Sequence, residues 1–252
     1  MHYDIIIPTC KSREEIEPQV QAIRATVPEH THIIVTGFNV SAAVNRNYGL
    51  QQATAPYVVM LDDDISGFFP GWADILCGFL TPFGFWKAAM VSARLINVDG
   101  TPGTMMDIEP DLRFNFQIVN PPGYLPSACV AFRNDGLRFD ESFEGSSWED
   151  TDFCDTLHLR YLGHFFVIAN EVRLLHANEM KNGNSRVFER NKRYYMQKHP
   201  ERGVACMKNE IIALWDAIKA RIAGKVFMQE FISRIQASAE MKIPPITAEV
   251  GA

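Results

Sequence analysis

The sequence predicts an α/β fold in which helices flank a central sheet. Three short apolar runs, each followed by turn or polar residues, are typical of strands buried on both faces; they cover residues 3–8, 32–36 and 57–61. Helical patterns separate these runs, and such an alternation is typical of a parallel sheet covered by helices. The first part of the chain is therefore predicted to run β-α-β-α-β.

The helix between the first two strands has two candidate starts. Ser12 and Glu15 have the spacing of a capping box, which would begin the helix at residue 12. Pro18 lacks a backbone donor, so the regular helix would otherwise begin near Glu17, with Pro18 in its first turn. The next helix is predicted over residues 41–52.

The second half of the chain is less regular. Residues 97–126 are rich in Gly and Pro and are expected to form long loops with an edge hairpin. Gly163 is expected to end one helix of this half. Its predicted elements are strands over 127–133 and 164–176, and helices over 148–162, 185–199 and 207–240.

Composition narrows the class of protein. The formal net charge of -6 argues against a broad basic surface for nucleic acid. The cysteines are scattered, odd in number and without zinc-binding spacing, so most are expected to be reduced core residues in a cytosol. The sequence shows no secretion signal and no stretch long enough to cross a bilayer. We therefore expect a cytoplasmic protein that is soluble or rests on a membrane surface.

Three consecutive aspartates follow the third predicted strand. Side chains alternate along a strand, so Asp62 and Asp64 can face one way and offer two oxygen ligands to Mg²⁺ or Mn²⁺. Ligands bind at the carboxyl ends of strands in open α/β sheets, where such an ion would neutralise a leaving diphosphate. An acidic turn after a strand has the same short pattern, so the interpretation depends on its combination with other signals.

An acidic cluster opens the helix predicted at 148–162. Acids in a first turn also complement the helix dipole, so a structural role is an alternative. A carboxylate at this position can take a proton from an attacking hydroxyl, and Asp150 is the candidate base.

A lone imidazole, His176, ends a predicted strand before a polar loop. Together with the aspartate pair it would complete a mixed nitrogen and oxygen site, which favours Mn²⁺ over Mg²⁺. Basic residues that follow it can clamp phosphate oxygens: Lys181, Arg186, Arg190, Lys192 and Arg193.

The order of these pieces resembles the family 2 glycosyltransferases, which have the GT-A fold. Residues 4–9 (DIIIPT) resemble the first strand of that family, and residues 44–50 (VNRNYGL) resemble its Arg-Asn-x-Gly-Leu helix. The aspartate trio is similar to its Asp-x-Asp metal motif, and residues 139–153 are similar to its Phe-Asp-Glu to Glu-Asp-x-Asp segment. His176 stands where relatives carry a metal-binding histidine.

The resemblance implies a Rossmann-like mixed sheet flanked by helices and a transferase that uses a nucleotide-sugar donor. A GT-A catalytic domain is expected over 1–200, with a nucleotide-sugar half (1–100) and an acceptor half (101–200). A helical extension is expected over 201–252, where peripheral membrane or homo-oligomer contact is an alternative to packing on the domain.

The resemblance also implies roles for individual residues. Asp62, Asp64 and His176 would bind Mn²⁺ or Mg²⁺, and Asp150 would deprotonate an acceptor hydroxyl for inverting displacement. Trp148 and Glu149 would face the acceptor, which is a glycan, a lipid-linked molecule or another hydroxyl compound. The nucleotide sugar would contact Pro8, Thr9, Arg13, Arg46, Asp62, Asp63, Lys181 and Arg186.

The sequence departs from the family pattern at two places, and both concern recognition of the nucleotide base. Many relatives have an aromatic residue after the Pro-Thr pair, where this chain has Cys10, and residues 36–39 lack their Asp-rich turn. A UDP-sugar is expected because it is common among relatives.

Two alternative functions remain. One is a nucleotidyltransferase, but such enzymes usually have a Gly-rich phosphate loop, which residues 8–13 lack. The other is a non-catalytic module that binds a sugar nucleotide or a glycan.

Overall fold

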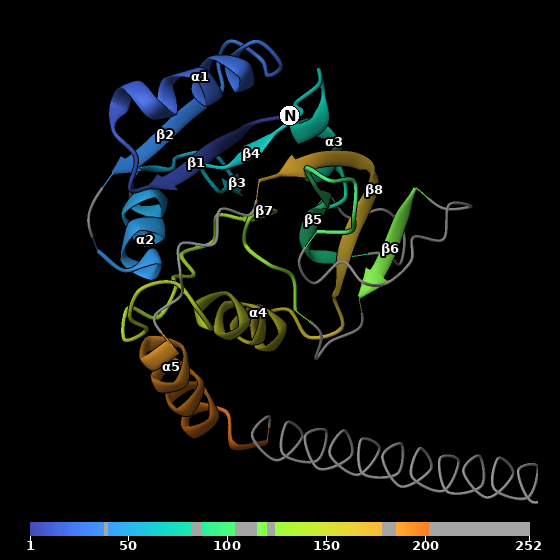
Figure 1. Cartoon of the computed structure of the whole chain (residues 1–252). Helices are drawn as coiled ribbons and strands as arrows, with labels where there is room; N and C mark the ends of the chain where they lie inside the picture. The colour runs from blue at the N-terminus through green and yellow to red at the C-terminus, as the bar shows by residue number, and fades with distance from the viewer. Residues whose placement is uncertain (38–39, 82–86, 104–114, 120–123, 178–184, 202–252) are drawn as a thin grey trace, which may run out of the picture. The chain divides into compact units, whose positions relative to one another are not determined.

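A computed structural model describes residues 1–37, 40–81, 87–103, 115–119, 124–177 and 185–201 (Figure 1). Residues Met1–Tyr195 form one compact unit and Met196–Ala252 a second. The extension predicted over 201–252 lies outside the described residues, apart from Glu201. The fold described below is that of the first unit.

The sheet is mixed, as the resemblance implied. Its strands follow the order β2-β1-β3-β7-β5-β8-β4, and β6 pairs with β8 outside this path. The bounds of the strands are β1 Tyr3–Thr9, β2 His32–Gly37, β3 Tyr57–Leu61, β4 Ile65–Ser66, β5 Ala88–Asn97, β6 Phe116–Val119, β7 Cys129–Arg133 and β8 Phe165–His176. The three strands predicted from the first apolar runs, β1, β2 and β3, are therefore confirmed.

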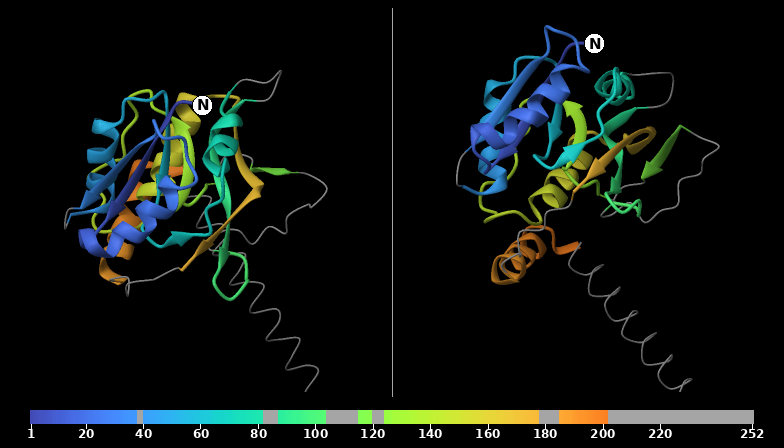
Figure 2. Two further views of the ribbon diagram at one scale, coloured as in Figure 1. Left: turned by 90° about the horizontal axis from the view of Figure 1, so that it is seen from above. Right: turned by 45° about the horizontal axis from the view of Figure 1, so that its top comes forward.

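The direction of the strands changes in the middle of the sheet. β1 pairs in parallel with β2 and β3, as predicted, whereas β7 runs antiparallel to both β3 and β5. The long strand β8 is parallel to β5, and β4 and β6 are antiparallel to it (Figures 1 and 2). Much of the segment 97–126, where long loops with an edge hairpin are predicted, lies outside the described residues. In its described parts Pro102 forms a bridge with Ile96, and β6 pairs with β8.

The described residues form five helices, of which α1 to α4 contact the sheet. Their bounds are α1 Arg13–Arg24, α2 Ala42–Gln52, α3 Trp72–Gly78, α4 Glu149–Arg160 and α5 Ser185–Lys198. Helix α1 begins after Ser12 with a complete capping box, so the start near Glu17 is wrong. Pro18 lies inside the helix and is exposed, so water can replace the hydrogen bond that proline cannot donate.

The apolar runs that predicted β1 and β3 are largely buried in the core of the fold. Ile5, Ile6 and Ile7 on β1 are each 0% exposed, as expected of a central strand covered on both faces. Cys77, Cys129 and Cys154 are buried thiols, as predicted, and Cys10 is exposed. No helix within the described ranges has the length and apolar character needed to span a bilayer.

Helix α2 lies unusually close to β1. A Cβ atom at Gly49 would be 2.3 Å from Cγ2 of the Ile6 side chain, inside any van der Waals contact. The helix therefore needs glycine at this position, and its close approach determines where the other α2 side chains lie.

Replacing Gly49 by Ala is expected to destabilise the protein by about 1–3 kcal/mol, because an added methyl group must force α2 away from β1. Chemical denaturation measures this loss. Gly78→Ala is the matched control, since a Cβ there meets no atom within 4 Å. Equal effects of the two substitutions would contradict the close-approach argument.

Candidate active site

The aspartates after β3 and the histidine that ends β8 come together through strand pairing. Short strand β4 follows Asp64 directly and pairs with the end of β8, so that Ile65 lies opposite His176. The backbone N–H of Ala177 donates to the Asp64 carbonyl at 3.1 Å. As a result, His176 Nε2 lies 3.3 Å from Asp64 Oδ1.

Asp62, Asp64 and His176 each offer a ligand atom, and these atoms lie within 4.8 Å of one another. Two ligands that are each about 2.1 Å from one ion are at most about 4.2 Å apart. Closure by less than an ångström would therefore allow all three side chains to contact one cation. Two carboxylates and one imidazole are a suitable ligand set for Mn²⁺. Mg²⁺, which prefers oxygen ligands, is the alternative ion.

Protonation of the cluster competes with the binding of a metal ion. Burial raises the pKa of the Asp62 carboxyl, and the charge of Arg46 opposes that shift. The hydrogen bond to Asp64 raises the pKa of His176, so a proton and a metal ion compete for the same imidazole. We therefore expect the affinity for a divalent cation to fall as the pH falls.

Asp63 faces away from this cluster, toward the end of β1. Its side chain accepts a hydrogen bond from the Thr9 hydroxyl, and Lys11 Nζ donates to its backbone carbonyl at 2.8 Å. Thr9 and Asp63, both predicted to contact the nucleotide, thus lie side by side, with Pro8 preceding them on β1. Sequence analysis did not select Lys11, although a cation just beyond a strand end is a signal for a phosphate contact.

Arg46 on α2 joins the aspartates to α4. Its guanidinium lies 2.6 Å from Glu149 Oε1 and 3.5 Å from Asp62 Oδ1. The side chain also lies over the Phe139 ring, 5.3 Å from the centroid. Glu149 is 3% exposed, and its second carboxylate oxygen has no hydrogen-bond partner in the described residues. The predicted nucleotide contact of Arg46 and acceptor contact of Glu149 stay predictions.

The candidate base lies next to this ion pair. Burial first, and then the charge of Glu149, raise the pKa of the Asp150 carboxyl to about 6, while Arg46 opposes the shift. Tyr124 is a neighbour that the sequence did not indicate: burial, followed by the charge of Asp150, raises the pKa of its phenol to about 12. A neutral phenol and a readily protonated carboxyl therefore lie at the start of α4.

Trp148 precedes α4 in a strained conformation. Its φ of 69° is the only positive value among the described non-glycine residues. The indole packs against Tyr195 at 5.0 Å and Phe188 at 5.8 Å between ring centroids, and its buried Nε1 has no hydrogen-bond partner in the described parts of the chain. Such strain is concentrated at functional sites.

The remaining residues predicted to contact the nucleotide sugar or its phosphates are at least partly exposed or lie outside the described residues. Arg13 is exposed at the first position of α1, and no hydrogen bond or ion pair among the described residues joins it to the carboxylates. Arg186 is exposed on α5, and Arg190 pairs with Glu144. Lys181 lies outside the described residues.

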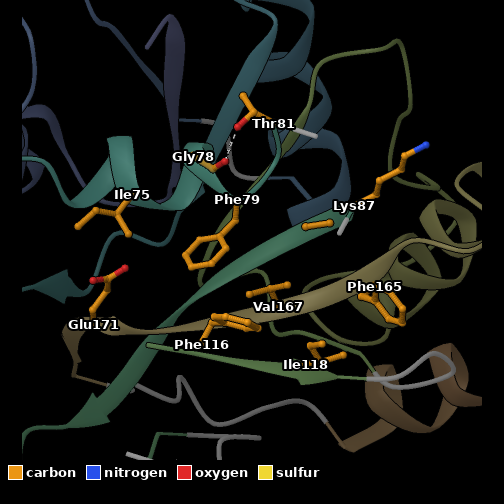
Figure 3. Close-up of a pocket in the computed structure, with 11 residues that line it drawn as sticks. Ile75, Gly78, Phe79, Thr81, Lys87, Phe116, Ile118, Phe165, Val167 and Glu171 are labelled. Carbon is orange, nitrogen blue, oxygen red and sulfur yellow. Dashed lines mark hydrogen bonds between the residues drawn. The ribbon is translucent and has the colours of Figure 1, made fainter. Parts of the chain in front are cut away.

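An apolar cavity of about 580 Å³ lies between α3, β5, β6 and β8 (Figure 3). Phe79, Phe116 and Phe165 line it, and the Lys87 side chain points away from these rings. It shares no lining residue with the cluster around Asp62. Although a cavity of this size suits a small molecule, the described residues that line it offer no ligand set for a cation, so the polar cluster is the candidate active site.

Comparison with known proteins identifies the fold. No protein-family profile and no curated protein sequence matches the chain. Among solved structures, residues 1–349 of S. aureus TarS in complex with UDP-GlcNAc are 15% identical, with a TM-score of 0.52; the match covers 69% of this chain and 58% of TarS. GalNAc-T7 with UDP, GalNAc and Mn²⁺ is 12% identical, with a TM-score of 0.53, over 79% of this chain and 50% of GalNAc-T7.

These matches confirm the predicted fold class: the chain has the mixed α/β fold of GT-A glycosyltransferases. It spans only 50–58% of the length of the two solved structures. Membership of family 2 and the roles of individual residues stay predictions.

Proposed function

We propose that the protein is a metal-dependent glycosyltransferase, which moves a sugar from a nucleoside diphosphate donor to an acceptor hydroxyl. The observation that carries this proposal is the cluster of Asp62 and Asp64, which follow β3, with His176 at the end of β8; Arg46 connects this cluster to the start of α4. The likeness to folds solved with UDP-GlcNAc, and with UDP and Mn²⁺, supports a UDP-sugar donor and Mn²⁺.

In this proposal the cluster holds the metal ion, which when bound would neutralise negative charge on the diphosphate. Thr9 and Asp63, in hydrogen-bond contact at the end of β1, would bind the nucleoside. Lys11, whose ammonium lies 3.7 Å from Asp63 Oδ1, supplies a positive charge beside them. The donor would therefore lie along the carboxyl ends of β1 and β3, where ligands bind in open α/β sheets.

Asp150 acts as the base. Its carboxylate takes the proton of the acceptor hydroxyl, and the hydroxyl oxygen attacks the anomeric carbon. The bond from that carbon to the diphosphate oxygen breaks, and its electron pair leaves with the diphosphate. One displacement inverts the anomeric configuration. Glu149 Oε2 and Trp148 Nε1 have no hydrogen-bond partner among the described residues, but both atoms are buried, so an acceptor would reach them only after a local rearrangement.

Release of nucleoside diphosphate tests the reaction class. Purified protein with Mn²⁺ and a panel of nucleotide sugars, UDP-sugars first, should release the diphosphate and label an added hydroxyl acceptor. Pyrophosphate release from a nucleoside triphosphate would instead support a nucleotidyltransferase. Donor binding without either product would support a binding module.

The rate of transfer is expected to depend on pH through Asp150. The base must be ionised, so kcat/KM should fall as the pH drops through the Asp150 pKa of about 6, by about tenfold per pH unit at the acid limit. Protonation of His176 also weakens metal binding, so Mn²⁺ must be saturating at each pH. A rate that stays constant from pH 7 to 5 would contradict the assignment of the base.

A further inference from the structure

Arg46 is enclosed by carboxylates from two separate parts of the fold. It is 6% exposed, and its two terminal nitrogens lie near Glu149 of α4 and Asp62 after β3. Burial lowers the pKa of the guanidinium, but the charges of Glu149 and Asp62 outweigh this effect and raise it. One buried cation therefore lies between two carboxylates and offsets part of their combined negative charge.

The neighbours of Arg46 hold it in place. The Asn47 side chain exchanges two hydrogen bonds with the backbone of Phe139, each 2.8 Å long. The Thr36 hydroxyl donates to the Asn45 carbonyl at 3.1 Å, which ties α2 to β2. Gly49 lets the same helix lie directly on Ile6. Arg46 thus projects from a helix whose position is set by contacts on several sides.

We infer that Arg46 is a positioning residue, which holds the metal ligand Asp62 and the base-bearing start of α4 in one arrangement and does not itself bind the nucleotide. The inference rests on the proposed function, because it assigns Asp62 to the metal and Asp150 to the base. A guanidinium suits this position, since its rigid fork can contact two carboxylates, which the single ammonium of lysine cannot do in the same geometry.

The arrangement couples the two halves of the site. Glu149 and Asp62 share one guanidinium, so neutralising Glu149 lets Arg46 move closer to Asp62 and withdraw that carboxylate from a metal ion. Removing Arg46 has the opposite effect, because it frees Asp62 and removes a positive charge beside the cation. The effects of Glu149 and Arg46 substitutions on metal affinity should therefore depend on each other.

A double-mutant cycle with Mn²⁺ alone tests this coupling. Calorimetry on the full chain measures the Mn²⁺ affinity of the native protein, Arg46→Met, Glu149→Gln and the double variant. Glu149→Gln is expected to weaken Mn²⁺ binding by about threefold or more when Arg46 is present, and by much less when Arg46 is Met. Arg46→Gln, which also removes the charge but can hydrogen bond Glu149, replaces Arg46→Met in the cycle if Arg46→Met does not fold.

Additive effects on Mn²⁺ affinity would overturn the inference and leave the proposed function intact. Failure of the native protein to bind Mn²⁺ would contradict both.

Kinetics of the folded variants give a second readout. Arg46→Lys is expected to lower kcat by about 10²-fold, since misplacement of about an ångström has an effect of this size. The KM for the donor should stay near its native value. Removing the positive charge in Arg46→Met should also move the acid limb of the pH profile upward, because Arg46 opposes the rise in the Asp150 pKa. A raised donor KM with unchanged kcat and pH profile would mean that Arg46 binds the nucleotide.

Discussion

Replacing Asp150 by Asn is expected to lower kcat for transfer by about 10²–10⁴-fold, the usual contribution of a general base. Asn has nearly the same size as Asp, but its amide is too weak a base to take the proton of the acceptor hydroxyl. The binding of UDP in the presence of Mn²⁺, measured by calorimetry, should stay close to that of the native protein, because Asp150 is assigned to the acceptor side of the site.

Asp155→Asn is the matched control for this substitution. Asp155 lies on the same helix, and its carboxylate accepts a hydrogen bond from the Tyr195 hydroxyl, which an amide oxygen can also accept. The control removes the same charge from α4 and should keep its activity. Loss of UDP binding in Asp150→Asn would show that Asp150 is a structural acid and not the base.

Removing a ligand of the metal site is expected to have the second large effect. Asp64→Ala or His176→Ala should lower transfer by at least about 10²-fold, because stabilisation of the leaving diphosphate by several kcal/mol depends on the ion. Mn²⁺ affinity, measured by calorimetry, should fall in parallel, and excess Mn²⁺ should restore part of the activity of His176→Ala.

His164→Ala is the matched control for the imidazole. His164 directly precedes β8, at the opposite end of the strand from His176, and its ring packs against Tyr161. The substitution should leave both Mn²⁺ binding and transfer near their native levels. Full activity of His176→Ala without added Mn²⁺ would remove His176 from the ligand set.

Much of the fold could be predicted because its signals are local. The apolar runs of β1, β2 and β3 and the capping box of α1 each lie within a few residues of the chain. Strand β5 was missed because its buried segment AAMVSARL mixes Ser92 and Arg94 with apolar residues and has no period that separates a strand from a buried helix. Helix α3 has only 7 residues, and Gly71 at its N-cap offers no side chain to cap it, so the helix lacks a start signal.

The candidate site was predictable in its residue types but not in its contacts. The aspartates, His176 and Asp150 have side chains whose chemistry is legible from the sequence. The convergence of Asp64 and His176 depends on the pairing of β4 with β8, which no local pattern encodes. Likewise, the Arg46–Glu149 contact joins residues 103 positions apart, and only the packed fold shows that one guanidinium serves both carboxylates.

Thermal unfolding with UDP, in the presence and absence of Mn²⁺, shows whether Asp62, Asp64 and His176 bind the cation that holds the nucleoside diphosphate. A ligand that binds only the folded state stabilises it by about 2.7 kcal/mol at a hundred times its Kd. We expect a large rise in Tm when UDP and Mn²⁺ are added together, and a loss of that rise in Asp64→Ala. Equal stabilisation by UDP with and without Mn²⁺ would contradict this assignment of the metal site.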